Sequence, residues 1–259
     1  MNQMDIYTRN QQIFTDTRRL SCTVYGDNTR VMQQGVQVYP DPLVLKATKK
    51  RNPPKIIFSR GGTLGSANKY RVDGRRMAVL NFADALIPGG LVLQGEVTQE
   101  ESICRCTNLY EGLILPTCIS DYYNVNRALG TAVYSDRLIY SPDVLVFKHG
   151  STYTNVKEPF YVDVITCPAP SCPVPQEVLY NRIRGILRVA GAYKVEQIVL
   201  GAWGCGAFGQ DATIVGSCFA QALKVENYFK TVIFAILEVV PQTDHGNFHF
   251  FQMGFSQAR

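Results

Sequence analysis

The sequence predicts one α/β domain with a largely parallel central sheet, and three observations support this fold class. Short apolar runs typical of buried strands alternate with segments of helical periodicity along the chain. No repeat, low-complexity tract or linker divides the 259 residues, and a chain of this length can bury the core of one large domain. Hydrophobic residues make up 46% of the composition and charged residues 18%, which excludes a disordered chain.

The individual elements follow from hydrophobic periodicity. A helix is predicted first, because Ile6, Ile13 and Leu20 recur about every two turns with polar residues between them. Strands are predicted from short apolar runs bounded by turn residues. The predicted helices cover residues 5–24, 101–115, 176–192 and 211–228. The predicted strands cover residues 36–38, 56–59, 77–82, 144–147, 161–166, 197–202 and 231–237.

The charge balance is weakly basic, with 26 Lys and Arg against 21 Asp and Glu and a formal net charge of +5. This balance suits an anionic ligand but is too modest to indicate a nucleic-acid binder. No apolar run approaches the roughly 20 residues of a membrane-spanning helix, and the best candidate, residues 232–237, is short enough for a buried strand. The first residues lack a signal-peptide pattern. We therefore expect an intracellular protein, cytoplasmic or nuclear, with no membrane partner.

Eight cysteines and three histidines raise the question of disulfides or a metal site. No CxxC pair occurs, and the histidines are not spaced with the cysteines as in a zinc module. His245 and His249 have the spacing of one helix face, but Gly246 and Asn247 between them favour a loop. We therefore expect reduced thiols and no metal site.

A Gly-x-Gly-x-x-Gly pattern runs from Gly204 to Gly209, between the strand predicted over 197–202 and the helix predicted over 211–228. Glycines let backbone N–H groups approach a phosphate closely, and the helix N-terminus adds partial positive charge. The simpler interpretation is a tight turn with Asp211 as the helix N-cap. The strand–loop–helix context favours a phosphate-binding loop.

A second pair of glycines, Gly89 and Gly90, follows the strand predicted over 77–82, and Gln99-Glu100-Glu101 follows them at the start of a helix. Taken alone, Thr98 to Glu101 is most simply a capping box, in which Glu101 bonds the Thr98 backbone. Two glycine loops beside two acids, however, suit a diphosphate ligand with a cleavable glycosidic bond. Hydrolysis needs a carboxylic acid to protonate the leaving oxygen and a carboxylate to activate water.

These motifs resemble those of the microbial-type poly(ADP-ribose) glycohydrolases. The matching stretches, in family order, are residues 79–83, 88–90, 99–101, 140–144, 164–170 and 200–209, with an opening segment over 9–20. The resemblance implies a macrodomain-like three-layer α/β/α fold with a mostly parallel mixed central sheet and an added N-terminal helical region. It implies a single domain over residues 1–259, of which residues 1–50 form the N-terminal accessory region.

The resemblance also implies a role for each matching residue. Glu101 would be the general acid/base that cleaves the ribose–ribose O-glycosidic bond, Glu100 would hold ribose hydroxyls, and Gln99 would support the loop. The other residues implied to contact the ligand are Asn81, Asp84, Gly89, Gly90, Leu91, Gly204, Cys205, Gly206, Ala207, Phe208 and Gly209. The ligand would be ADP-ribose or poly(ADP-ribose), with ADP-ribosylated protein or nucleic acid as candidate acceptors, in a monomer without a metal or redox cofactor.

Three residues depart from the family pattern. Leu91 stands where the family has a third glycine, and its side chain is expected to obstruct close backbone approach or to demand a different φ. Asp84 stands where the family has Asn, and an ionised carboxylate only accepts hydrogen bonds and repels a diphosphate. Glu96 adds an acid where small residues are usual. These changes leave Glu101 in place but predict an altered linkage, slower turnover or binding alone.

Three functions therefore remain open. The leading hypothesis is an ADP-ribosyl glycohydrolase that releases ADP-ribose from poly(ADP-ribose) or a related conjugate. The second, favoured by Leu91 and Asp84, is a catalytically weak or inactive ADP-ribose-binding module. The third is an NAD-dependent oxidoreductase, which requires an acid about 20 positions after the glycines. Glu238 ends a strand-like run but lies somewhat far along, and the glycine pattern falls near the end of the chain.

Overall fold

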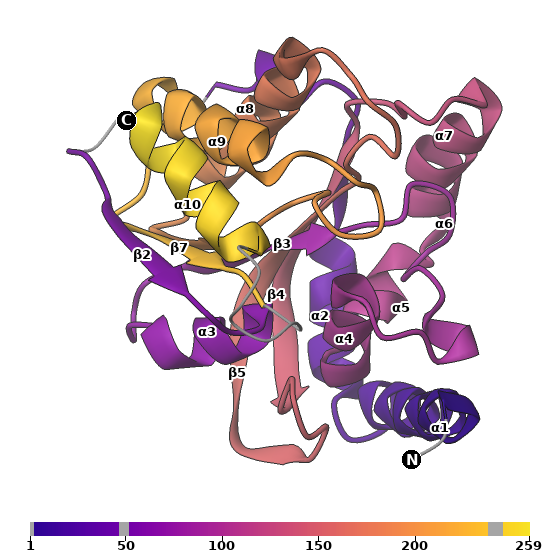
Figure 1. Cartoon of the computed structure of the whole chain (residues 1–259). Coiled ribbons are helices and arrows are strands. Elements are labelled where there is room, and N and C mark those ends of the chain that lie inside the picture. Colours follow the sequence, from indigo (N-terminus) through magenta and orange to yellow (C-terminus); the bar gives the residue numbers. More distant parts are fainter. Residues whose placement is uncertain (1–2, 47–51, 238–245) are drawn as a thin grey trace.

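A computed structural model describes residues 3–46, 52–237 and 246–259, and its centre is a seven-stranded mixed sheet (Figure 1). The strands are β1 (Gln37–Tyr39), β2 (Lys55–Ser59), β3 (Met77–Phe82), β4 (Leu138–Lys148), β5 (Asn155–Cys167), β6 (Gln197–Leu200) and β7 (Thr231–Ala235). Their order is β1-β4-β5-β3-β6-β7-β2. β4 runs antiparallel to β1 and β5, and every other neighbouring pair is parallel. The predicted mostly parallel sheet is confirmed.

Helices cover both faces of this sheet. They are α1 (Gln3–Cys22), α2 (Gly26–Gly35), α3 (Thr63–Tyr70), α4 (Gln99–Cys106), α5 (Leu109–Leu113), α6 (Pro116–Cys118), α7 (Asn124–Leu129), α8 (Gln176–Ala192), α9 (Ala212–Val225) and α10 (Asn247–Gln257). Two 3₁₀ turns, η1 (Pro42–Val44) and η2 (Val92–Gln94), and a π-helical turn, η3 (Ile119–Tyr123), complete the described elements.

The two faces have separate apolar cores, because successive residues of a strand point to opposite sides. Ala78 and Leu80 of β3 pack with residues of α8, α9 and α10. Met77 and Val79 pack with residues of α1 to α5 on the other face. Figure 1 shows α8, α9 and α10 together on one side of the sheet. The result is the three-layer α/β/α arrangement that was expected.

Several predicted elements need correction. The helix predicted over 101–115 is wrong, because α4 ends at Cys106 and Thr107 forms a β-bridge with Val146 before α5 begins. The loop expected around Gly246 is also wrong, because that glycine is the N-cap of α10. His245, which was considered together with His249, lies outside the described residues. The structure also adds α2, α3, α6, α7 and α10, which were not predicted, and it lengthens β4 and β5.

The strand order brings the two glycine loops together. β3 and β6 are parallel neighbours, so their carboxyl ends lie side by side and the chain leaves both strands at the same end of the sheet. The carbonyl of Cys167, at the end of β5, accepts hydrogen bonds from Ala83 N–H at 3.4 Å and from Trp203 Nε1 at 3.0 Å. The segment after β3 and the segment after β6 therefore share one anchor. Ligands of open α/β sheets bind at this kind of edge.

Candidate active site

Glu100 and Glu101 lie in the first turn of α4, where it faces the glycine pair after β3. Only 2% of Glu100 and 3% of Glu101 is exposed. Gly90 adopts a φ of +59° and lies against both acids: a Cβ there would overlap Oε1 of Glu101 and lie 3.2 Å from Oε2 of Glu100. The two carboxylates therefore meet at Gly90, and a glycine is required there both for its conformation and for its lack of a side chain.

Both carboxylate oxygens of Glu101 have hydrogen-bond donors. Leu91 N–H donates to Oε1 at 2.9 Å, and the Thr98 hydroxyl donates to Oε2. Thr98 occupies the N-cap position of α4, but its side chain makes no cap bond. The predicted capping box is therefore wrong, because the Thr98 and Glu101 side chains bond each other instead of the helix backbone.

Glu100 is held from the opposite side. Asn81 Nδ2 donates to Oε1 at 3.0 Å, and Asp84 N–H donates to Oε2 at 2.7 Å. Burial raises the pKa of Glu100 well above its ordinary value, and the neighbouring Glu101 and Asp84 carboxylates add to the shift. The two hydrogen bonds oppose it without cancelling it. Glu100 therefore tends to keep its proton at a pH at which an exposed glutamate has lost it.

Gln99 connects the start of α4 to the end of β3. Its Oε1 accepts from Phe82 N–H at 2.8 Å, and its Nε2 donates to the Leu80 carbonyl at 2.8 Å and to Thr63 Oγ1 at 2.9 Å. Every polar atom of the Gln99 amide is therefore engaged. The following turn, which carries the two acids, is fixed relative to the sheet.

The three residues that depart from the family pattern have ordinary local geometry. Asp84 Oδ1 accepts from Leu86 N–H at 2.6 Å and from Ile87 N–H at 2.9 Å, which is a turn that an Asn oxygen forms equally well. Leu91 has a φ of −94°, which any residue adopts, and 39% of it is exposed. Leu91 contacts the site through its backbone N–H. The Glu96 carboxylate accepts from the next backbone N–H, that of Val97.

In the glycine loop after β6, one glycine is closely packed, whereas the other two face open space. Gly204 has a φ of +78°, and a Cβ there would lie 2.6 Å from the Ala169 Cβ and 2.9 Å from Gln210 Cγ. At Gly206 and Gly209 a Cβ would meet nothing within 4 Å. Of the other residues predicted for this loop, Cys205 is buried, Phe208 is half-buried and Ala207 is exposed.

The end of this loop begins α9 as predicted. Asp211 is the N-cap, and its side chain accepts from Thr213 N–H at 2.7 Å and from Ile214 N–H at 3.1 Å. Gln210 Nε2 donates to the carbonyls of Pro170 at 2.7 Å and Cys172 at 2.9 Å. The loop is thus fixed at its far end to the segment that follows β5. Its open face lies between this anchor and the one at Trp203.

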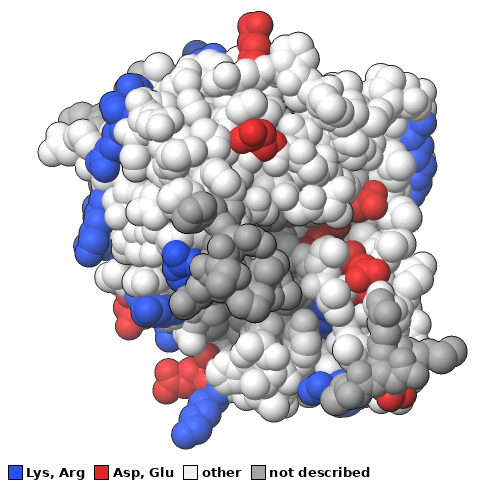
Figure 2. Space-filling model, in the orientation of Figure 1, with Lys and Arg blue, Asp and Glu red and all other residues white. Residues whose placement is uncertain are grey.

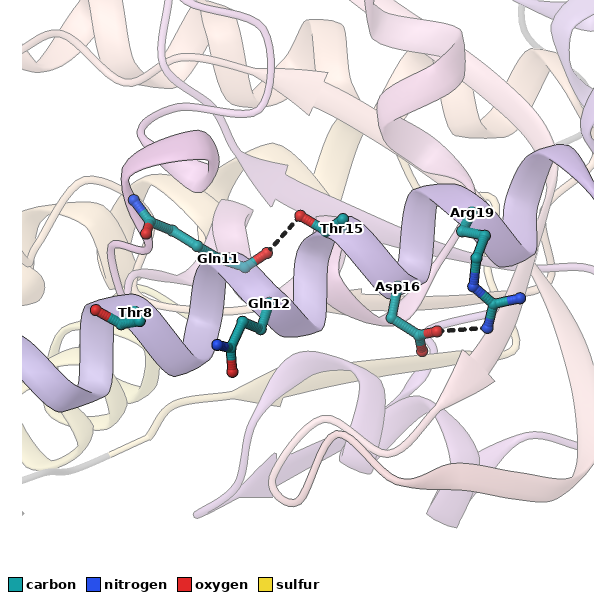
Figure 3. Close-up of a pocket in the computed structure, with 6 residues that line it drawn as sticks. All are labelled: Thr8, Gln11, Gln12, Thr15, Asp16 and Arg19. Atoms are coloured by element: carbon teal, nitrogen blue, oxygen red, sulfur yellow. Dashed lines mark hydrogen bonds and ion pairs between the residues drawn. The ribbon is translucent and has the colours of Figure 1, made fainter.

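Charge is unevenly distributed around this edge. Figure 2 shows several acidic side chains beside a hollow on one face of the molecule, while most Lys and Arg side chains lie toward the margins of that face. A separate hollow of about 380 Å³ lies on α1 and is lined by Thr8, Gln11, Gln12, Thr15, Asp16 and Arg19 (Figure 3). None of the residues predicted for the site lines this second hollow.

Sequence reasoning paired Thr98 with Glu101 through the wrong atoms and missed two other hydroxyl groups around the acids. Thr98 carried a local signal, because a hydroxyl three residues before a glutamate on a helix can reach it. Thr63, which accepts from Gln99, and Thr166, which accepts from Asn81 at 3.2 Å, come from distant segments. No local pattern could have identified these two.

The cysteines and the candidate metal ligands considered in the sequence form no further site among the described residues. All eight cysteines are free thiols, and burial raises the pKa of Cys205 to about 12. Across residues 3–46, 52–237 and 246–259, no group of three His, Cys, Asp or Glu side chains is arranged to hold a metal ion. In the same ranges, every helix is too short or too polar to cross a membrane. Glu238, the acid weighed for an oxidoreductase, lies outside the described residues.

Comparison with known proteins identifies the family and agrees with the fold. The sequence profile of the microbial-type PARG catalytic domain, where PARG is poly(ADP-ribose) glycohydrolase, matches residues 4–149. The crystal structure of PARG from Thermomonospora curvata is 27% identical and superposes with a TM-score of 0.82, over 97% of this chain and 100% of that one. No curated protein sequence matches this chain.

Two further similar structures contain a ligand. PARG from Deinococcus radiodurans in complex with ADP-ribose is 31% identical, with a TM-score of 0.80 over 88% of this chain and 97% of that one. The Thermomonospora curvata enzyme bound to the inhibitor ADP-HPD is 26% identical, with a TM-score of 0.81 over 96% and 99% of the two chains. With a family profile that matches more than half of its residues and a relative at 31% identity over most of its length, this chain belongs to the microbial-type poly(ADP-ribose) glycohydrolase family.

Proposed function

We propose that this domain releases ADP-ribose from poly(ADP-ribose), or from a related ADP-ribose conjugate, with Glu101 as the general acid/base. The observation that carries the proposal is the meeting of Glu100 and Glu101 at Gly90, beside a second glycine loop with an open face. A buried pair of acids next to a phosphate-binding loop suits a ligand that has both a diphosphate and a glycosidic bond.

Glu101 would act twice in the reaction. As a carboxylic acid it donates its proton to the ribose–ribose bridging oxygen while the glycosidic C–O bond breaks. As a carboxylate it then takes a proton from the water that forms the new C–O bond, which restores the acid. The Thr98 hydroxyl suits both stages, because a hydroxyl donates to a carboxylate and accepts from a carboxylic acid.

Glu100 would bind the ribose rather than transfer the proton. Its two oxygens already accept from Asn81 Nδ2 and Asp84 N–H, which fixes its orientation. Because burial raises its pKa, the protonated form can also donate to a ribose hydroxyl. Asn81 and Asp84 thus shape the ribose pocket through Glu100, and Gln99 holds the turn that carries it.

The two glycine loops would bind the diphosphate. Gly89, Gly90 and Leu91 lie beside the acids and would line the ligand, although the Leu91 N–H is already donated to Glu101. The segment from Gly204 to Gly209, with Cys205, Ala207 and Phe208, presents its open face from the neighbouring strand. Backbone N–H groups bind phosphate without a cationic side chain. The ADP-ribose complex of the Deinococcus enzyme supports ADP-ribose as the ligand of this domain.

A release assay with Glu101→Gln tests the mechanism. We expect the wild type to release ADP-ribose from poly(ADP-ribose), and the variant to lose about 10²- to 10⁴-fold in kcat, the range for a general acid/base. ADP-ribose affinity, measured by calorimetry, should stay within about threefold. Glu158→Gln is the matched control, because this glutamate lies at an exposed position of β5. Release at the wild-type rate by Glu101→Gln would contradict the assigned role.

The alternative is a catalytically weak or inactive ADP-ribose-binding module. The Asp84 carboxylate near the proposed diphosphate site favours it, because like charges repel. Tight ADP-ribose binding by the wild type without any release would establish the module and overturn the glycohydrolase. Absence of both binding and release would overturn both functions.

We also propose that residues 1–259 form one monomeric domain with an accessory region over residues 1–50, acting inside the cell on ADP-ribosylated protein or nucleic acid. Free cysteines are usual in reducing compartments, which supports a cytoplasmic or nuclear location. Light scattering tests the monomer, and release assays on modified protein and modified nucleic acid distinguish the acceptors.

A further inference from the structure

The segment between the glycine pair and α4 encloses the Glu101 carboxylate. We call residues 91–98 the Leu91–Thr98 loop. Its first residue donates a backbone N–H to Oε1 of Glu101 at 2.9 Å, and its last residue donates a hydroxyl to Oε2. The position of each carboxylate oxygen therefore depends on the position of one end of this loop.

The middle of the Leu91–Thr98 loop is held by two buried side chains from outside it. Asn10 Nδ2, on α1, donates to the Gly95 carbonyl at 2.8 Å. Arg105 Nη1, on α4, donates to the next carbonyl, that of Glu96, at 2.5 Å. Asn10 is 5% exposed and Arg105 is fully buried. Two successive backbone carbonyls are thus fixed by buried side chains from two different helices.

The backbone of α1 also lies directly on the loop. Gly95 has a φ of +86°, and a Cβ there would overlap the Tyr7 carbonyl. Thr17, further along α1, donates its hydroxyl to the Arg105 carbonyl at 2.6 Å, and buried Lys148 donates to the Thr17 hydroxyl at 2.8 Å. Helix α1 therefore contacts both the loop and the helix that carries Glu101.

We infer that Asn10 and Arg105 are positioning residues that hold the Leu91–Thr98 loop where its two ends orient the Glu101 carboxylate. The inference rests on the proposed role of Glu101. Catalysis requires the acid to stay within a few tenths of an ångström of the bond that it protonates. The N-terminal helix thereby becomes part of the catalytic support, although its residues act through the backbone of the loop.

Asn10→Asp provides the first test, because it preserves shape while placing an acceptor against the Gly95 carbonyl. Asn10→Ala serves if the first variant does not fold. We expect kcat to fall about tenfold or more, with ADP-ribose affinity within about twofold of wild type. Arg105→Met should lose about as much, and Arg105→Lys, which retains a donor, should recover most of it.

The matched control is Thr15→Ala on the same helix. Figure 3 shows Thr15 on the face of α1 that lines the separate hollow, and its hydroxyl bonds the Gln11 carbonyl at 2.9 Å. Removing that local bond should leave kcat unchanged. A fall in kcat for Thr15→Ala as large as that for Asn10→Asp would overturn the inference, because the effect would then belong to α1 as a whole.

Amide hydrogen exchange gives a readout independent of activity. The Leu91 N–H is protected by Glu101 in the wild type, and Asn10→Asp should speed its exchange at least tenfold, while the amide of Val79 in the core strand β3 stays protected. Unchanged exchange at Leu91, or equal acceleration at Leu91 and Val79, would overturn the inference. If the wild type released no ADP-ribose, the proposed function would fail while this measurement still decided the positioning role.

Discussion

Gly90 lies directly against Glu101, eleven positions further along the chain. Gly90 has a φ of +59°, and the position that a Cβ would occupy on this residue points at Oε1 of Glu101. The next backbone N–H, that of Leu91, donates to the same oxygen. The glycine pair and the acidic turn therefore form one structure, in which the missing side chain of one residue makes room for the carboxylate of another.

Gly90→Ala should abolish most of the activity. The added methyl group would overlap Oε1 of Glu101 and displace it, and a displacement of about 1 Å can lower kcat about 100-fold. The positive φ should lower the free energy of unfolding by about 1 kcal/mol in addition. Release of ADP-ribose and urea unfolding measure the two effects.

Gly130→Ala separates the two effects. Gly130 has a nearly identical φ of +61° at the end of α7, but a Cβ there would meet nothing within 4 Å. We expect it to lose about 1 kcal/mol of stability and no activity. If both alanine variants kept full activity, the contact between Gly90 and Glu101 would have no catalytic role.

Strong local periodicity was sufficient to predict part of the fold. The strand predicted over 77–82 and the helix predicted over 176–192 have the bounds of β3 and α8. The helix predicted over 101–115 failed because its apolar periodicity continues through Thr107, where a long-range bridge to Val146 interrupts it. The sequence does not show such a contact, because its partner lies 39 positions away.

The C-terminal helix shows a different reason for failure. Phe248, Phe251 and Phe255 recur at the spacing of one helix face, and all three are buried against the sheet. Gly246 favours a loop in the sequence, but in the structure it is the N-cap of this helix, a position that glycine also occupies. At the site, the acids and glycines could be predicted from local motifs. The contact of Asn10 with Gly95 could not, because it joins segments 85 positions apart.

Asp84→Asn should strengthen ligand binding. The amide oxygen of Asn can accept from Leu86 N–H and Ile87 N–H as Asp84 does now, so the turn and its stability should be retained. The substitution removes a negative charge near the proposed diphosphate. We expect the Kd for ADP-ribose to fall about threefold to tenfold at low salt, with a smaller gain at 1 M salt because screening weakens the repulsion.

Calorimetry at the two salt concentrations checks this prediction. Asp121→Asn is the control, because this carboxylate lies on η3 and accepts from Ser120 in an exposed position. Weaker binding by Asp84→Asn would mean that the carboxylate itself contacts the ligand favourably, for example through a ribose hydroxyl.

Glu100 should make the fold less stable as pH rises. Burial raises its folded-state pKa well above the ordinary 4.5, so the folded chain binds a proton that the unfolded chain has lost. Stability therefore falls as pH increases from about 4.5 toward the folded-state pKa, with a slope of at most about 1.4 kcal/mol per pH unit for one proton. Glu100→Gln should remove this contribution.

Urea unfolding between pH 4.5 and 7.5 measures that slope. As pH rises, the unfolding free energy of the wild type should decrease relative to that of Glu100→Gln. Glu158→Gln, at an exposed position of β5, should keep the wild-type slope. Parallel pH profiles for wild type and Glu100→Gln would show that the folded Glu100 does not retain its proton.

Gly206→Ala tests the open face of the loop after β6. A Cβ at Gly206 would meet nothing within 4 Å and its φ is not positive, so the unfolding free energy should change by less than about 0.5 kcal/mol. If the diphosphate lies against this face, the methyl group occupies its space and the Kd for ADP-ribose should rise at least about tenfold. Gly204→Ala should instead destabilise the fold by about 2 kcal/mol, because it combines a positive φ with overlap at Ala169 and Gln210. Unchanged ADP-ribose affinity in a folded Gly206→Ala protein would place the diphosphate away from this loop, since a ligand held by backbone N–H groups cannot tolerate a side chain between them and itself.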